Sequence, residues 1–367
     1  MGKYNTLLSP VKYGNTLLKN RIIFAPTTLG LREKEYLKKI DDIAKGGCAL
    51  IVVGDVPVAK SRFGFSLFSK SGFEHYKKIT DIGHKYGCLI SAQLHQNDTQ
   101  FKGMFKYVPK IMTGKMSKMD LRKILNDKTG EYISSIESEE VEKITSSFGD
   151  AAVKAVEAGF DMIMIHGDRM CGSFSSSLFN RRKDKYGGSV ENRTRFAVEA
   201  VEAVRKALPD VSIDYKLAVR VESPHYGNAG ITEDEIKVFV PALEKAGVTS
   251  FHVALADHGK LEDTIPPSDH KYFGEEGCFL RFCDTVRKYT DLPICGVGGL
   301  SDPDYIEEQI DKGRIDCAAM SRQLIADPDW VKKVYENKEN TIKVCRRCNK
   351  KCLGGMYEHK GVHCIYE

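Results

Sequence analysis

Eight short apolar segments, each followed by a stretch with helical periodicity, constrain the fold of this chain more than any other feature. Repeated alternation of strands and helices predicts parallel strands covered by helices, because a right-handed crossover needs the intervening helix. Eight such repeats predict closure into a (β/α)8 TIM barrel, a fold of the α/β class. The apolar segments span residues 22–26, 49–53, 88–94, 162–166, 217–221, 250–253, 293–297 and 316–320.

A doubly wound open sheet is the alternative architecture for such a pattern. It is disfavoured because no predicted strand is followed directly by the G-x-G-x-x-G turn that binds a dinucleotide. The chain has 367 residues, more than the ~250 typical of one barrel. We therefore assign residues 1–335 to the barrel and residues 336–367 to a short C-terminal segment. Between the third and fourth strands, one helical face carries Val141, Ile144, Phe148, Ala151, Ala152 and Ala155.

The bulk composition predicts a globular protein of the cytoplasm. The N-terminus has no apolar signal core, and no window approaches the ~20 apolar residues needed to cross a membrane. A net charge of +5 is modest, although lysines concentrate between residues 102 and 128. We interpret that stretch as a solvated face and expect no nucleic-acid partner, because few aromatic side chains accompany the lysines.

Four of the eleven cysteines lie within the last 23 residues, and their spacing predicts a ligand set, Cys345-x2-Cys348-x3-Cys352-x11-Cys364. Reducing conditions argue against disulfides and favour metal binding by the thiolates. Zinc and iron-sulfur clusters both use four cysteines, so the residues leave both open. The basic side chains between them would offset cluster charge and help an electron donor to dock, or form a solvated face; these are Arg346, Arg347, Lys350 and Lys351.

In a TIM barrel the chemistry is expected at the carboxyl ends of the strands and in the loops that follow. The loops after the seventh and eighth strands commonly bind a phosphate through backbone N–H groups, and glycines permit the close approach. Tight-turn glycines beside an exposed arginine are the alternative interpretation of either loop by itself. The predicted phosphate site comprises Gly298, Gly299, Ser321 and Arg322.

Several segments along nearly the whole chain resemble the old yellow enzyme family. The resemblance is to its iron-sulfur branch, which includes 2,4-dienoyl-CoA reductase and trimethylamine dehydrogenase. The segments are LLSPVKYGNTLLKNRIIFAP, QLHQ, EAGFDMIMIHG, LFNRRKDKYGGSVENRTRF, GVGGL with SRQLIADPDW, and the cysteine motif.

This resemblance implies FMN across the barrel mouth, with its phosphate at the site predicted above, and a 4Fe-4S cluster held by Cys345, Cys348, Cys352 and Cys364. A glutamine amide can pair with the pyrimidine edge of the flavin, and a cationic arginine can stabilise negative charge on the reduced ring. The residues implied to contact the ring are Pro26, Thr27, Thr28, Gly54, Gln93 and Arg220.

The acid-base residues depart from the family pattern of His-x-x-His or His-x-x-Asn followed two residues later by Tyr. Here His166 matches, but Arg169 replaces the second His or Asn and Cys171 replaces the tyrosine. An arginine favours an anionic oxygen, whereas a thiol is a poor hydrogen-bond donor. His258 matches an active-site histidine of the dienoyl-CoA reductase branch and is a second candidate proton donor.

These features predict an FMN and 4Fe-4S dependent reductase of a carbon–carbon double bond conjugated to a carbonyl or carboxylate. The small-molecule substrate would bind through His166 and Arg169, with a proton from His258, Cys171 or water. Relatives of this branch continue into FAD and NAD(P)H domains, whereas this sequence stops three residues after Cys364. Either the sequence is a shortened one or electrons arrive from a separate electron-donor protein, and we predict the separate donor. Oxidative amine cleavage of the trimethylamine dehydrogenase type is one alternative. A non-catalytic, zinc-stapled binding barrel is another.

Overall fold

Eight parallel strands close into a barrel in the computed structural model, which describes residues 3–61, 64–98 and 107–367. Strand β10 pairs with both β7 and β11, and this double pairing closes the circle. The predicted TIM barrel is therefore confirmed, with each predicted apolar segment overlapping one barrel strand. In order around the barrel, the strands are β3 (Ile22–Phe24), β4 (Leu50–Pro57), β5 (Leu89–His95), β6 (Met162–His166), β7 (Ser212–Glu222), β10 (Ser250–Leu255), β11 (Ile294–Gly296) and β12 (Cys317–Met320).

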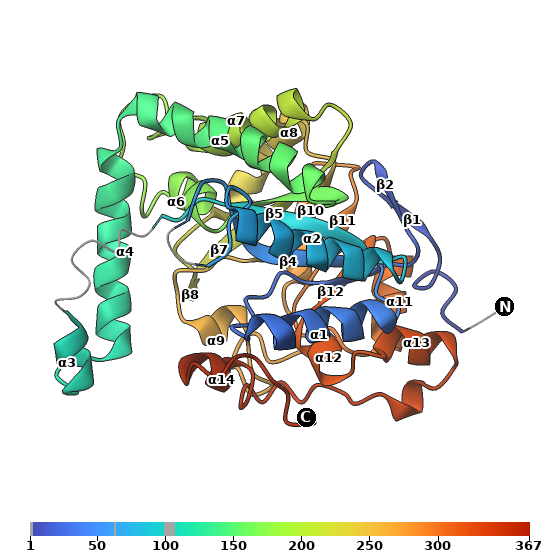
Figure 1. Cartoon of the computed structure of the whole chain (residues 1–367). Coiled ribbons are helices and arrows are strands. Elements are labelled where there is room, and N and C mark those ends of the chain that lie inside the picture. The colour runs from blue at the N-terminus through green and yellow to red at the C-terminus, as the bar shows by residue number, and fades with distance from the viewer. Residues whose placement is uncertain (1–2, 62–63, 99–106) are drawn as a thin grey trace.

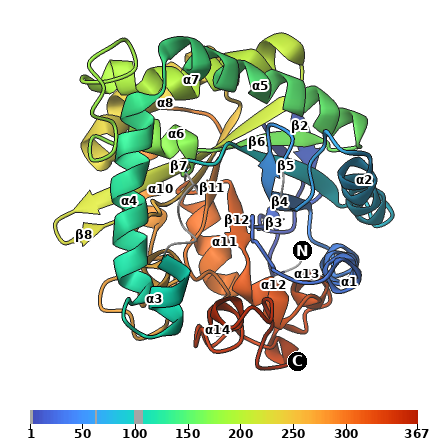
Figure 2. The ribbon, with the colours of Figure 1, turned by 60° about the vertical axis from the view of Figure 1, so that its left-hand side comes forward.

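Helices surround the strands, as Figures 1 and 2 show from two directions. Each packs an apolar face against the barrel, because an amphipathic helix gains stability by burying its apolar stripe. The covering helices are α1 (Glu33–Lys45), α2 (Lys70–His84), α5 (Ser138–Glu157), α7 (Val190–Ala207), α8 (Ile236–Ala246), α10 (Leu280–Val286), α11 (Pro303–Asp311), α12 (Arg322–Ala326) and α13 (Trp330–Tyr335).

Shorter elements supplement the barrel strands and covering helices, and most of them lie in loops between a barrel strand and the helix that follows it. They are strands β1 (Val11–Tyr13), β2 (Thr16–Leu18), β8 (His225–Tyr226) and β9 (Ile231–Thr232), helices α3 (Val108–Met112), α4 (Lys118–Ser135), α6 (Met170–Ser175), α9 (Leu261–Thr264) and α14 (Leu353–Tyr357), and the 3-10 turns Glu233–Glu235 and Glu339–Thr341.

The predicted apolar face of α5 is buried as expected. Val141, Phe148 and Ala152 are fully inaccessible, and Ile144 lies at the edge of the core. This face packs against the barrel and against α7. No helix within residues 3–61, 64–98 and 107–367 combines the length and the apolar character that crossing a bilayer demands.

The β1–β2 hairpin contributes to a small core cluster inside the barrel. Tyr13 and Leu18 are fully buried there, packed with side chains from several barrel strands. The Tyr13 hydroxyl donates to Asp214 Oδ1 at 3.0 Å, and burial raises the pKa of Asp214 to about 7. Apolar packing and this hydrogen bond fill the interior beneath the strand ends that carry the polar residues.

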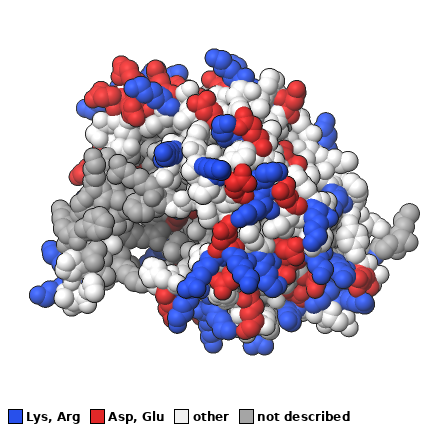
Figure 3. Space-filling model, viewed as in Figure 1, with Lys and Arg blue, Asp and Glu red and all other residues white. Residues whose placement is uncertain are grey.

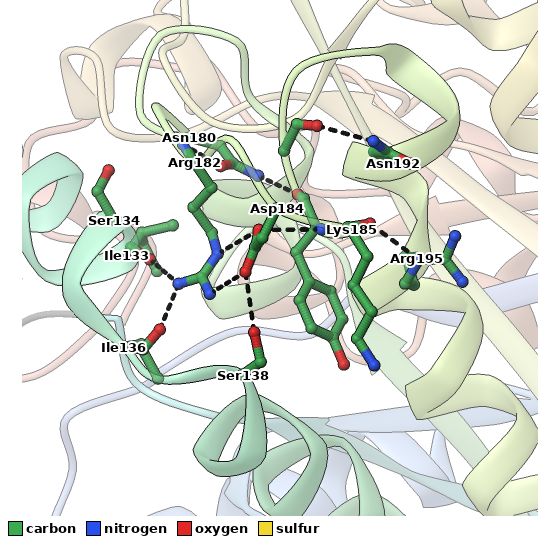
Figure 4. A network of polar contacts seen from close by, with 12 residues as sticks. Ile133, Ser134, Ile136, Ser138, Asn180, Arg182, Asp184, Lys185, Asn192 and Arg195 are labelled. Carbon is green, nitrogen blue, oxygen red and sulfur yellow. Dashed lines mark hydrogen bonds and ion pairs between the residues drawn. The ribbon is translucent and has the colours of Figure 1, made fainter.

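Helices α3 and α4 stand away from the barrel at the left of Figure 1. They carry most of the lysine-rich stretch, of which residues 102–106 lie outside the described residues. Arg182 fixes the carboxyl end of α4: its Nη1 donates to the carbonyl oxygens of Ile133 and Ile136, and its Nη2 pairs with Asp184 (Figure 4). Asp184 in turn accepts from Ser138 at the start of α5. The LFNRRKDKYGG segment thus joins α4 and α5 to the barrel.

The C-terminal segment packs against the loop that follows β3. The Val362 amide donates to the Leu29 carbonyl at 2.7 Å, and Lys39 of α1 pairs with Glu367 at 2.6 Å. A side chain at Gly361, whose φ is +81°, would collide with Leu31. Close backbone packing therefore places the cysteine motif beside the carboxyl ends of the strands.

We expect Arg182→Ala to lower the free energy of unfolding by about 3 kcal/mol or more, because it leaves two carbonyls and a carboxylate without their buried cationic partner. The neighbouring Arg181→Ala is the matched control, since Arg181 is exposed. Urea denaturation of both variants measures the difference. Similar stability of the two variants would contradict the anchoring role.

Candidate active site

A cavity of ≈ 280 Å³ opens where the carboxyl ends of the barrel strands meet. Residues from the first barrel strand, from the later strands and from the C-terminal segment line this cavity. They lie together because the carboxyl ends of all strands of a TIM barrel meet at one rim. Of the residues predicted to bind the cofactor, all except Arg220 line this cavity, namely Pro26, Thr27, Thr28, Gly54, Gln93, Gly298, Gly299, Ser321 and Arg322.

Arg220 lies elsewhere. The pairing of β7 with β10 ends at Val219, so Arg220 extends beyond the barrel rim. Its guanidinium is buried and donates to the carbonyl of Gly230 and the hydroxyl of Ser177, both at 2.8 Å. These contacts hold the β7–β9 loop, and the cation of β7 that does line the cavity is Lys216.

The predicted phosphate site has the backbone that an anion requires. Gly298 and Gly299 have φ angles of +128° and +70°, which favour glycine. A side chain at Gly298 would lie 2.9 Å from the Phe279 amide nitrogen, and one at Gly299 would lie 2.7 Å from Arg347 Nη1. Ser321 precedes α12, whose first N–H groups lack partners within the helix. Close approach and free N–H donors fit the phosphate of FMN.

Buried polar atoms deeper in the cavity suit a heterocyclic ring. Gln93 is 2% exposed, and among the described residues its amide donates only to the weakly accepting sulfur of Met164. His252 Nδ1 is buried and, within the described part of the chain, has no hydrogen-bond partner. Burial, with help from Lys216, lowers the pKa of His252 to about 3, so the imidazole is neutral. Such unsatisfied groups are expected where a ligand supplies the missing hydrogen bonds.

His166 lies in the cavity wall as a neutral imidazole. Burial lowers its pKa well below the ordinary value, and the charges of Lys216 and Arg169 lower it further. Its Nδ1 accepts a hydrogen bond from the Asp168 amide at 3.2 Å, which leaves the proton on Nε2. Nε2 lies 3.9 Å from Asp55 Oδ1. His166 therefore presents one N–H donor at the end of β6.

Asp168 connects three elements at the cavity wall. Its Oδ2 accepts from Lys216 Nζ at 3.0 Å, and its Oδ1 accepts from the Asp257 amide at 2.8 Å. Asp168 is 2% exposed, so the pair is held in a region of low dielectric. This geometry places an ammonium and a carboxylate in direct contact beside the cavity.

Arg169 is the free cation of the cavity. In the described ranges of the chain, its guanidinium makes neither a hydrogen bond nor an ion pair. Burial lowers its pKa, but the carboxylates of Asp55, Asp257 and Asp98 outweigh burial and raise it overall. The field of these carboxylates stabilises the charge, while the five N–H donors of the guanidinium stay available to a ligand.

The other two predicted catalytic residues do not line the cavity. Cys171 is buried, and burial raises the pKa of its thiol far above the ordinary range. His258 Nε2 lies 2.9 Å from Asp98 Oδ2, and its ring packs edge-on against Phe179. Burial lowers the pKa of His258, but the Asp98 carboxylate raises it overall, while the pKa of Asp98 falls to about 2. His258 and Asp98 thus form a buried ion pair behind the site.

The four cysteines of the C-terminal motif line a second, small cavity of ≈ 20 Å³. Cys345 and Cys352 also line the large cavity, as does Arg322, so the two sites share a wall. In the described residues, no group of three or more His, Cys, Asp or Glu surrounds a single point as the ligands of one zinc ion do. Thiols that frame a cavity fit a cluster in which each thiolate binds a different iron.

Sequence reasoning did not place Lys216, His252 or Arg347 in the cavity, and it grouped Arg347 with basic side chains that offset cluster charge and help a donor to dock, or form a solvated face. Lys216 follows Asp214 by two residues in a largely buried strand, and charges at every second position of such a strand mark one face of it. That signal was available, but the predicted strand began at residue 217. No such pattern distinguishes Arg347 from its basic neighbours.

We expect Asp98→Asn to destabilise the protein in a pH-dependent manner. The ion pair requires ionised Asp98 and protonated His258, so its contribution is fully present from about pH 3.8 to 6.5, the ordinary pKa values of the two groups. It is lost as the pH falls towards 2 or rises through the raised pKa of His258. Urea denaturation should show a loss of about 3 to 5 kcal/mol near pH 5.5 and a smaller loss near pH 9.

Ser173→Ala is the control for this comparison, because it removes another contact of Asp98, a hydroxyl donor at 2.6 Å that does not titrate. A loss in Asp98→Asn that is equal at both pH values would mean that the pair contributes no charge interaction.

Comparison with known proteins places these observations in a family. Residues 6–341 match the NADH:flavin oxidoreductase / NADH oxidase family. The chain is 56% identical over 365 residues to a bilirubin reductase of Clostridium symbiosum, covering 99% of this chain and 98% of the relative. It is 34% identical to a bilirubin reductase of Mediterraneibacter gnavus, covering 98% of this chain but 56% of that longer protein.

Among solved structures, histamine dehydrogenase from Rhizobium sp. 4-9 superposes with a TM-score of 0.81 at 23% identity, over 100% of this chain and 52% of the other. This likeness shows the shared fold. Together with the family match, it confirms the resemblance on which the FMN expectation rested. The chain is a flavin-dependent oxidoreductase and belongs to the NADH:flavin oxidoreductase / NADH oxidase family.

Proposed function

We propose that this protein reduces carbon–carbon double bonds of bilirubin or a closely related linear tetrapyrrole, using FMN and a 4Fe-4S cluster. The observation that carries the proposal is the Arg169 guanidinium, which lines the large cavity and makes no hydrogen bond or ion pair with any residue that the structure describes. Bilirubin has double bonds conjugated to lactam carbonyls and carries propionate carboxylates, so it offers the oxygen ligands that such a guanidinium binds. The relative that shares 56% identity over nearly its whole length is a bilirubin reductase.

When bound, FMN would supply hydride transfer to the double bond and the cluster would supply single electrons. Gly298, Gly299 and Ser321 would hold the phosphate, while Gln93 and His252 would bind the ring. The four cysteines would hold the cluster, and their shared wall with the large cavity keeps the two groups adjacent. The lining of one cavity by all four thiols supports a four-cysteine ligand set, which this proposal assigns to the cluster.

Arg169 and His166 bind the substrate oxygen in this proposal. As the double bond is reduced, negative charge develops on the conjugated oxygen, and a fixed guanidinium beside a neutral N–H donor stabilises that charge. His166 contributes a hydrogen bond without a charge, because its pKa lies well below the ordinary value. Arg169 contributes the charge.

The proton that completes the reduction comes from the Lys216–Asp168 pair or from water in contact with it. The Lys216 ammonium lines the cavity and is held at 3.0 Å by Asp168 Oδ2. Cys171 and His258, the donors predicted from the sequence, lie outside the cavity, so neither can reach a substrate double bond there. His258 instead contributes by fixing Asp98, whose charge helps to keep Arg169 protonated.

Electrons reach the cluster from a separate carrier protein in this proposal. Residues 343–367 contain six Lys or Arg against two Glu, and Arg346, Lys350 and Lys351 are exposed beside the cysteines. Figure 3 shows basic side chains gathered over the lower part of the molecule, where α1 and the C-terminal segment lie. A basic surface steers an acidic partner toward the cluster.

Product analysis tests the activity directly. Purified protein incubated anaerobically with bilirubin and a chemical reductant should yield products heavier by two hydrogens for each double bond reduced. Unchanged bilirubin, with flavin present and reduced, would refute the substrate.

We expect Arg169→Gln to lower kcat/KM for bilirubin by about 100-fold, which corresponds to the loss of roughly 2.7 kcal/mol of charge stabilisation at the substrate oxygen. Arg169→Lys should recover part of this loss, because it restores the charge without the planar fork. Flavin content should be unchanged in both variants. Activity of Arg169→Gln within twofold of the natural protein would contradict the assigned role.

We expect Cys348→Ser to abolish turnover driven by a protein electron donor while sparing bilirubin reduction when the flavin is reduced chemically. The reason is that the cluster delivers electrons but takes no part in hydride transfer. Steady-state assays with each reductant measure the two routes. Equal loss by both routes would contradict delivery through the cluster.

A further inference from the structure

We propose that Arg347, supplied by the cysteine segment, is a second phosphate-binding arginine of the FMN site. Its position between two predicted cluster ligands gives no sign of such a role. The inference deepens the proposed function by adding a cofactor ligand, and it rests on the flavin assignment alone, not on the identity of the substrate.

The guanidinium of Arg347 lies at the phosphate site. Arg347 lines the large cavity, and its Nη1 is so close to Gly299 that an added Cβ there would lie 2.7 Å away. Gly298, Ser321 and Arg322 line the same cavity. The absence of a side chain at Gly299 therefore leaves room for this guanidinium beside the two glycines that approach the anion.

Arg322 and Arg347 bring two positive charges together without a carboxylate. Arg347 donates to the carbonyl oxygens of Gly274 and Glu275, and Arg322 donates to the Pro266 carbonyl and to Asn349 Oδ1. In the described portion of the chain, neither arginine forms an ion pair with an acidic side chain. Two guanidinium groups next to each other repel unless an anion lies between them, and a phosphate dianion is the anion that FMN provides.

The cysteine segment holds Arg347 in this orientation. Its backbone has a φ of +48°, an uncommon value for a residue with a side chain. The Arg347 amide donates to Cys345 Sγ at 3.4 Å, and its carbonyl accepts from the Ser268 amide at 3.2 Å. The turn that brings the Cys345 thiol to the small cavity thus also directs the Arg347 side chain toward Gly299 and the large cavity. Its neighbour Arg346 is exposed and lies over the Tyr366 ring at 5.9 Å.

This arrangement links retention of the flavin to the cysteine segment. A purely structural arginine that held residues 274 and 275 would affect every flavin alike. A phosphate ligand affects FMN and leaves riboflavin, which lacks the phosphate, unchanged. The comparison of these two flavins separates the two roles.

The test uses the full-length protein with its iron content verified. Flavin is removed anaerobically, and FMN and riboflavin are titrated back while quenching of flavin fluorescence is followed. We expect Arg347→Gln to weaken FMN binding by about 10-fold to 100-fold, the effect of losing a charge-assisted hydrogen bond to an anion, and to change riboflavin binding by less than twofold. Arg346→Gln, which removes the same charge from the exposed neighbour, should leave both affinities unchanged.

Equal loss of FMN and riboflavin affinity in Arg347→Gln, or unchanged FMN affinity, would overturn the inference. Should Arg347→Gln fail to assemble its iron, Arg347→Lys provides the same comparison, with FMN affinity expected between those of the natural protein and the Gln variant. Failure of the natural protein to bind either flavin would refute the flavin assignment itself, an outcome distinct from failure of the Arg347 role.

Discussion

The closed circle of parallel strands is the constraint on which the rest of the structure depends. Because every strand runs in the same direction, the carboxyl ends of all eight meet at one rim, and residues as distant in sequence as Pro26 and Arg322 line one cavity. The Tyr13–Leu18 cluster fills the interior beneath them. Function therefore resides in the strand ends and in the segment that packs against them.

Charge balance gives the cavity its selectivity. Asp168 neutralises Lys216 through direct contact, whereas the charges of nearby carboxylates raise the pKa of Arg169 and so stabilise its cation. Lys216 is thereby paired within the protein, whereas the Arg169 guanidinium is available to a ligand. A similar logic applies at the other end of the cavity, where Arg322 and Arg347 bond to carbonyl and amide oxygens and keep their charges for an anion. The end of the cavity at Arg322 and Arg347 thus attracts negative charge.

The sequence was sufficient for the barrel and for most of the cavity wall, because strand periodicity and the position of polar residues after each strand follow from local chemistry. The sequence was insufficient for residues whose position relative to the cavity depends on the point at which a strand leaves the barrel. Arg220 and Lys216 lie four residues apart on β7, and only the end of pairing at Val219 decides which of them faces the cavity. His258 depends likewise on a tertiary partner, Asp98, that no local pattern connects to it.

The most direct test is anaerobic rapid mixing of the fully reduced protein with bilirubin while flavin absorbance is recorded. The account predicts that oxidised flavin reappears in step with the loss of bilirubin, and that methylated amines leave oxidised flavin unchanged. Flavin that stays reduced in the presence of bilirubin, or that an amine bleaches, would contradict it.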